Sequence, residues 1–93
     1  MTARSVPPRT VAVRFLLDAD ADAGLLPRLL QPFAKRDLIP EHMNAARTGA
    51  TMQVEILLLD ADPAEVARIA GNLGQVVGVR HVSQMTEPVM RAA

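Results

Sequence analysis

Two stretches of the chain alternate between apolar and polar positions, and each alternation predicts a β-strand. The first covers residues 9–17 and the second covers residues 51–59. Period two with β-branched residues is typical of strands that bury one face. The expected inner faces are Val11, Val13, Phe15 and Leu17, then Met52, Val54, Ile56 and Leu58; the outer faces are Thr10, Ala12, Arg14 and Leu16, then Gln53, Glu55, Leu57 and Leu59.

Each strand is followed by apolar residues at helical spacing. After Gly24 the apolar positions are Leu25, Leu26, Leu29, Leu30 and Phe33. Two prolines interrupt this pattern. Pro27 suits a helix that starts close to Gly24, because amides of the first turn have no partners in any case. Pro32 removes an interior hydrogen bond, so the sequence predicts a kink or break between Arg28 and Pro32.

The second helix has clear start and stop signals. Asp62 is a favourable N-cap, Pro63 fits the first helical position, and Glu65 stands where a capping-box acid reaches back to the N-cap. Gly74 is the expected stop. The apolar stripe between these signals is Val66, Ile69, Ala70 and Leu73.

Two weaker strands complete the pattern. Residues 39–47 contain Pro40 and charged residues, which favour a sheet edge, and Gly49 in the following short turn favours a hairpin. Residues 76–83 form the last predicted strand, with Val77 and Val79 pointing inward. Val82 breaks that alternation, which predicts a bulge or a change of face.

The order strand, helix, strand, strand, helix, strand predicts an α+β, ferredoxin-like βαββαβ sandwich. Its four-stranded antiparallel sheet carries both helices on one face. The two most apolar strands are expected at the centre, running parallel to each other with right-handed crossovers. The opposite face has no cover in a single chain, and its leucines predict burial against another subunit.

Length and composition place this fold in a single domain. The 93 residues fit a flexible N-terminal lead (1–8), one domain (9–84) and a flexible C-terminal tail (85–93). No apolar stretch reaches the length of a signal peptide or a membrane span, so we expect a soluble, cytoplasmic protein.

Composition narrows the possible functions. Ten basic residues balance ten acidic ones, which argues against binding to nucleic acid or anionic lipid. No cysteine and only two aromatic residues are present, which excludes thiolate chemistry and stacking platforms of the RNA-recognition type. No nucleophile–base pair is evident, so we expect no catalytic residues and no enzyme activity of the chain's own. The two histidines stand on separate strands without a ligand pair at helical spacing, so we expect no metal site, and we expect no cofactor.

The acidic turn between the first strand and helix admits two interpretations. Its aspartates resemble the opening of a calcium loop, but the sixth and twelfth positions hold Ala23 and Leu29 instead of glycine and an acid. A solvated acidic turn is the preferred interpretation. Gly24 is either a turn glycine that needs a positive φ or a residue that lets a ligand approach the backbone. His42 and His81 are interpreted as ordinary surface or interface histidines.

The segment FLLDADADAGLLPRLLQPFAKRDLIPEHMNAA resembles the ACT domain, a ferredoxin-like module that binds amino acids and regulates enzymes. The resemblance extends from Thr10 to about Gln84. Within that family, HMNAA and NLGQVVGVRHV are similar to the short small subunit of acetohydroxyacid synthase, also called acetolactate synthase.

The resemblance implies an effector site between two copies of the chain. The first strand–helix turn of one copy would face the second strand of its neighbour. By position this site comprises Asp20, Asp22, Ala23, Gly24, Leu25, Pro40, Glu41 and His42. Helix-terminal amides would hold a carboxylate and the acids would meet an ammonium group. Ala21 and Pro40 stand where valine-responsive members have asparagines, which argues against valine as the effector.

The function implied by the resemblance is regulatory. The chain would bind the large catalytic subunit of the synthase, which carries thiamine diphosphate, magnesium and a flavin, in branched-chain amino-acid biosynthesis. Two alternatives stay open: a stand-alone ACT homodimer that senses an amino acid or another small molecule, and a purely structural interaction domain.

Overall fold

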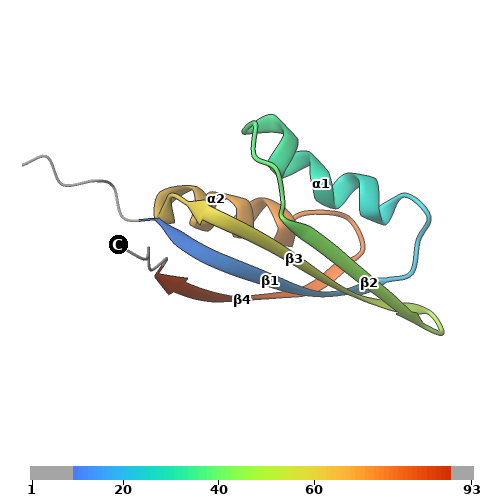
Figure 1. Cartoon of the computed structure of the whole chain (residues 1–93). Coiled ribbons are helices and arrows are strands. Elements are labelled where there is room, and N and C mark those ends of the chain that lie inside the picture. The colour runs from blue at the N-terminus through green and yellow to red at the C-terminus, as the bar shows by residue number, and fades with distance from the viewer. Residues whose placement is uncertain (1–9, 89–93) are drawn as a thin grey trace, which may run out of the picture.

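Six elements follow one another in this computed structural model, which describes residues 10–88. They are β1 (Val11–Asp20), α1 (Leu25–Lys35), β2 (His42–Thr48), β3 (Thr51–Ala61), α2 (Pro63–Gly74) and β4 (Val79–Pro88). Both helices lie on one side of a four-stranded sheet (Figure 1). The predicted ferredoxin-like sandwich is therefore confirmed.

The sheet has the order β2-β3-β1-β4, and all neighbouring strands are antiparallel. The apolar strands β1 and β3 occupy the centre as predicted, with Phe15 opposite Ile56. The prediction that these two strands run parallel was wrong. The α1 crossover leaves β1 and β2 pointing the same way, and the hairpin around Gly49 (φ +62°) reverses the chain, so β3 runs against both.

The core lies between the sheet and the two helices. Phe15 of β1 and Phe33 of α1 meet edge to face, with ring centroids 5.9 Å apart and planes at 74°. Each fully buried side chain of this kind contributes about 1.5–3 kcal/mol. The buried set follows the predicted alternation and helical stripes: Val13, Phe15, Leu17, Ala19, Leu25, Leu29, Phe33, Val54, Ile56, Leu58, Ala61, Val66, Ile69 and Leu73.

Helix α1 runs unbroken through Pro32, so the prediction of a break between Arg28 and Pro32 was wrong. Pro32 has no amide to offer the carbonyl of Arg28. Its ring is buried in line with Leu25, Leu29 and Phe33, and this burial offsets the missing hydrogen bond.

Helix α1 ends in a Schellman motif whose left-handed residue is an aspartate. The amide of Leu38 donates to Phe33 O at 2.9 Å, and the amide of Asp37 donates to Ala34 O at 3.1 Å. Asp37 has φ +57°, a conformation that glycine adopts most easily. The stop is therefore set by the backbone and by packing of Leu38 against the core.

Helix α2 starts and ends as predicted, with one difference. Asp62 Oδ1 accepts the amide of Ala64 at 3.0 Å, and the helix ends at Gly74. Glu65 does not complete a capping box. Its carboxylate lies 3.3 Å from Arg36 Nε at the end of α1, and this ion pair joins the two helices.

Strand β4 lies closer to the C-terminus than predicted. Val77 precedes it and is 77% exposed, so the prediction that Val77 points inward was wrong, whereas Val79 packs against the core. The register shifts by one residue around Arg80, which confirms the irregularity inferred from Val82. The strand continues through Pro88, so residues 85–88 belong to the sheet and not to a loose tail. The predicted flexible segments 1–8 and 89–93 lie outside the described residues.

Candidate functional site

The turn between β1 and α1 is held by two other connections of the chain. The amide of Asp20 donates to Gly78 O, before β4, and the amide of Ala21 donates to Ala50 O in the β2–β3 hairpin, both at 2.8 Å. The turn that carries the first half of the predicted effector site therefore has a fixed place at one end of the sheet.

Arginines already neutralise the two acids of this turn. Asp20 Oδ1 accepts Arg80 Nε at 2.6 Å, and Asp22 Oδ2 accepts Arg28 Nη2 at 2.7 Å. The hydrogen bond to Asp20 and its negative charge raise the pKa of Arg80. An incoming ammonium group would have to displace these guanidinium groups or share the two carboxylates with them. Neither arginine was predicted from the sequence to contact this turn.

The backbone conformation of Gly24 does not require glycine, since its φ is −85° and its ψ is 0°. The suggestion that it is a turn glycine with positive φ was therefore wrong. An added Cβ would lie 2.7 Å from Arg28 Nη1, the mobile end of a long side chain. Glycine at this position leaves room for Arg28 to lie over Asp22.

The start of α1 offers few free amides. The amide of Leu25 is bonded to Asp22 O at 3.0 Å, and Pro27 has no amide. The Leu25 side chain is fully buried, so this predicted site residue serves the core. Ala23 is exposed beside it.

The second half of the predicted site lies at the other end of the sheet. Asp20 is level with Thr51, and Thr51 is level with Thr48 at the end of β2, six residues beyond His42. At a strand rise of about 3.3 Å per residue, His42 lies about 20 Å along the sheet from that level. One chain therefore does not bring the two halves together.

Local contacts fix this second half at the edge of the sheet. The amide of Glu41 donates to Leu57 O at 2.7 Å, and His42 Nε2 lies 4.0 Å from Glu55 Oε1. Glu41 and His42 are exposed, and Pro40 is half-buried. All three are open to a neighbouring molecule.

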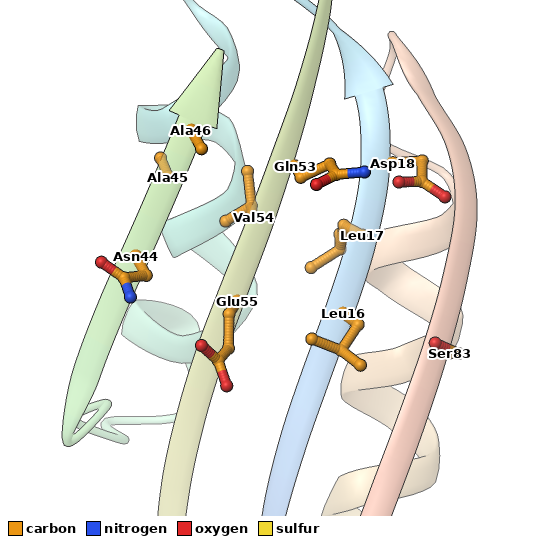
Figure 2. A pocket seen from close by; sticks show the side chains of 10 residues that line it. All are labelled: Leu16, Leu17, Asp18, Asn44, Ala45, Ala46, Gln53, Val54, Glu55 and Ser83. Carbon is orange, nitrogen blue, oxygen red and sulfur yellow. The ribbon is translucent and has the colours of Figure 1, made fainter. Parts of the chain in front are cut away.

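The sheet face away from the helices, here called the open face, contains a shallow hollow of about 410 Å³ (Figure 2). Leu16 is one of its lining residues and is half-buried, and Arg14 and Glu55 form an ion pair on the same face. The residues that β1 and β3 contribute follow from the alternation in the sequence. The residues that the edge strands contribute depend on strand register and were not predicted: Asn44 and Ala46 from β2, and Ser83 from β4.

Metal and membrane features are not found in the described part of the chain. Between residues 10 and 88 no group of three or more His, Asp or Glu side chains is arranged to hold a metal ion. No helix in the same range has the length and apolar character that crossing a bilayer requires.

The sequence matches a known protein family over nearly its whole length. The model of the ACT-like domain matches residues 6–89, nearly the whole chain. The chain belongs to the ACT-like domain family. Domains of this family are in general regulatory modules without catalytic activity. No curated protein matches the sequence.

Solved structures agree on the fold of this ACT-like domain. The ACT domain of GTP pyrophosphokinase from Chlorobium tepidum superposes with a TM-score of 0.70 at 12% identity, covering 83% of this chain and 99% of its own. The C-terminal domain of the MgtC protein from Mycobacterium tuberculosis gives 0.68 at 16% identity, covering 90% and 95%. An uncharacterized protein from Thermotoga maritima gives 0.60 at 12% identity, covering 88% and 99%.

Proposed function

We propose that this ACT-like domain is a regulatory module whose effector site is shared between two copies of the chain. The observation that carries this proposal is the separation of the two halves of the site. The turn at Asp20–Leu25 and the strand start at Pro40–His42 lie at opposite ends of one sheet, so a site that contains both would need a second copy.

The open face supports association. Leu16 and Leu57 are half-buried, and Leu59 and Met85 are 43% and 54% exposed on the same side of the sheet. Apolar side chains among paired charges are typical of a face that a second subunit covers. The edge strand β2 is also exposed along most of its length.

The mechanism of regulation is a shift of population. An effector that bridges two copies binds the dimer more tightly than the monomer, so it favours whichever partner state requires the dimer. The effector would be a small molecule with a carboxylate and an ammonium group. Its carboxylate would meet the start of α1, and its ammonium group would meet Asp22 or Glu41 of the two copies.

The partner enzyme we propose is acetohydroxyacid synthase, because HMNAA in β2 and NLGQVVGVRHV, which runs from the end of α2 into β4, resemble its small subunit. The chain would act as its regulatory subunit in branched-chain amino-acid biosynthesis, within the cytoplasm. A stand-alone sensing dimer is the second candidate, favoured by a site that two copies complete without a third chain.

Two measurements separate these candidates. Adding the chain to the purified large synthase subunit should raise its turnover and yield a complex on size-exclusion chromatography. Calorimetric titration with the twenty amino acids should give heat for at least one. Heat without a complex leaves the stand-alone sensor. A complex without heat refutes the effector site. If the chain gives no complex and no heat, only the structural interaction domain is left.

A further inference from the structure

A second concave surface lies on the helical side of the molecule, away from the open face. One wall is the face of α1 that carries Arg28, Gln31, Pro32 and Lys35. The other wall is the end of α2 and the connection that follows it, with Asn72, Gln75, Val76 and Val77. This α1–α2 groove has a volume of about 510 Å³, within the range of small-molecule sites.

The charge of the α1–α2 groove has one sign. Arg28 and Lys35 lie seven residues apart on α1, two helical turns, so they stand towards opposite ends of the same wall. No carboxylate lines the groove among residues 10–88, and none of them forms an ion pair with Lys35. Lys35 is exposed, so its ammonium group is accessible to an anion.

Arg28 closes one end of the groove. Its Nη2 donates to Asp22 Oδ2 at 2.7 Å and to Val77 O at 3.4 Å, so the guanidinium group joins α1 to the opposite wall. Because Arg28 already forms an ion pair with Asp22, the anionic group of a ligand would pair with Lys35 at the other end of the groove. The side-chain amides of Gln31 and Gln75 offer further donors.

Each wall of the groove also contributes apolar residues. Pro32 is buried, Val76 packs against the core, and Val77 is 77% exposed on a connection fixed at both ends. The amide of Asp20 donates a hydrogen bond to Gly78 O, and the amide of Val76 donates one to Leu73 O at 3.2 Å. A ligand that covers Val77 therefore removes apolar surface from water without ordering a loose segment.

We propose that the α1–α2 groove binds a small organic carboxylate with an aliphatic body. The carboxylate pairs with Lys35, and the body lies over Pro32, Val76 and Val77. The groove adjoins the turn of the predicted effector site through the contact between Arg28 and Asp22, but it is complete within one chain. Its presence or absence therefore does not depend on the proposed function.

The test is a titration of the full chain with sodium hexanoate, followed by amide chemical shifts in NMR spectra. Shifts should concentrate at residues 28–35 and 72–78. Hexanamide, which has the same body without the charge, should bind about twofold to fivefold more weakly, as expected for one exposed ion pair. Lys35→Gln should weaken hexanoate binding by a similar factor and leave hexanamide binding unchanged.

Arg68→Gln is the matched control. Arg68 is an exposed arginine of α2 that lies outside the groove and pairs with Glu65. This variant should bind hexanoate as the wild type does. Val77→Ser should weaken both probes, because it removes an apolar side chain from the groove. Equal binding of the two probes, an unchanged affinity in Lys35→Gln, or shifts centred on the open face would each overturn the proposal.

Discussion

Arg14 of β1 reaches diagonally across the sheet to Glu55 of β3, with Nε 2.5 Å from Oε2. The Nε atom is buried but its N–H does not point along a hydrogen bond, so the contact is an ion pair. The side chains are 43% and 28% exposed in one chain. An exposed pair of this kind contributes less than about 1 kcal/mol, whereas breaking a buried pair costs about 3 kcal/mol or more.

This difference gives the first prediction. Glu55→Gln should lower the free energy of unfolding by less than about 1 kcal/mol at protein concentrations that favour the monomer. Where the dimer prevails, the cost should rise to about 3 kcal/mol per chain, because a second copy covers the unpaired Arg14. Urea unfolding at the two concentrations measures both values. A cost that does not depend on concentration would mean that the open face stays in water.

Association can be tested at Leu16, which lines the hollow. Leu16→Glu places a third carboxylate beside Asp18 and Glu55 and should dissociate the dimer while the monomer stays folded. Sedimentation velocity gives the oligomeric state, and circular dichroism checks the fold. Ile39→Glu is the control, because Ile39 is 86% exposed and lies outside the open face. Dissociation by the control alone would contradict the proposed interface.

The left-handed residue at the end of α1, Asp37, is a position where a substitution should stabilise the protein. Asp37→Gly should raise the free energy of unfolding by up to about 1 kcal/mol, because glycine adopts φ +57° without steric cost. Asp37→Val should lower it, since a β-branched side chain resists this conformation. Thermal unfolding of both variants decides the matter, and equal effects of glycine and valine would show that Asp37 is not strained.

The aromatic pair in the core predicts a large loss. Phe33→Ala removes a fully buried ring that meets Phe15 and should cost about 3–5 kcal/mol. For a chain of this size that is a large share of the total stability. Ile39→Ala, at an exposed position, should change stability by about 0.5 kcal/mol or less. Similar losses in both variants would argue against this core.

Local patterns were sufficient for much of the fold. Alternation in β1 and β3 predicted which side chains face the helices, because the side-chain period of a strand is two. Asp62, Pro63 and Gly74 predicted the bounds of α2, since capping depends on neighbouring residues only. The end of α1 escaped prediction because its left-handed residue is an aspartate and not a glycine.

Contacts between distant residues could not be predicted in the same way. Asp20 pairs with Arg80, sixty residues away, and Glu65 pairs with Arg36 and not with its own helix end. Pro32 is tolerated because of packing that only the assembled core provides. The α1–α2 groove likewise combines two walls that are far apart in the sequence. The predicted effector residues came from a resemblance, and their role stays a prediction.

The central claim is that the effector site is divided between two copies. Gly24→Asp should block the turn half while the domain stays folded, since Arg28 can move and aspartate is a favourable N-cap. His42→Ala should disable the strand half without affecting the buried core. Each variant alone should give no heat with the amino acid that binds the wild type.

The most direct measurement is calorimetry on an equal mixture of these two variants, after exchange of subunits. Half of the dimers are then mixed, and each mixed dimer contains one site with both halves intact, so the mixture should recover about one quarter of the wild-type sites. A site contained within one chain would recover none. No heat from the mixture, when the wild type binds, would contradict the account.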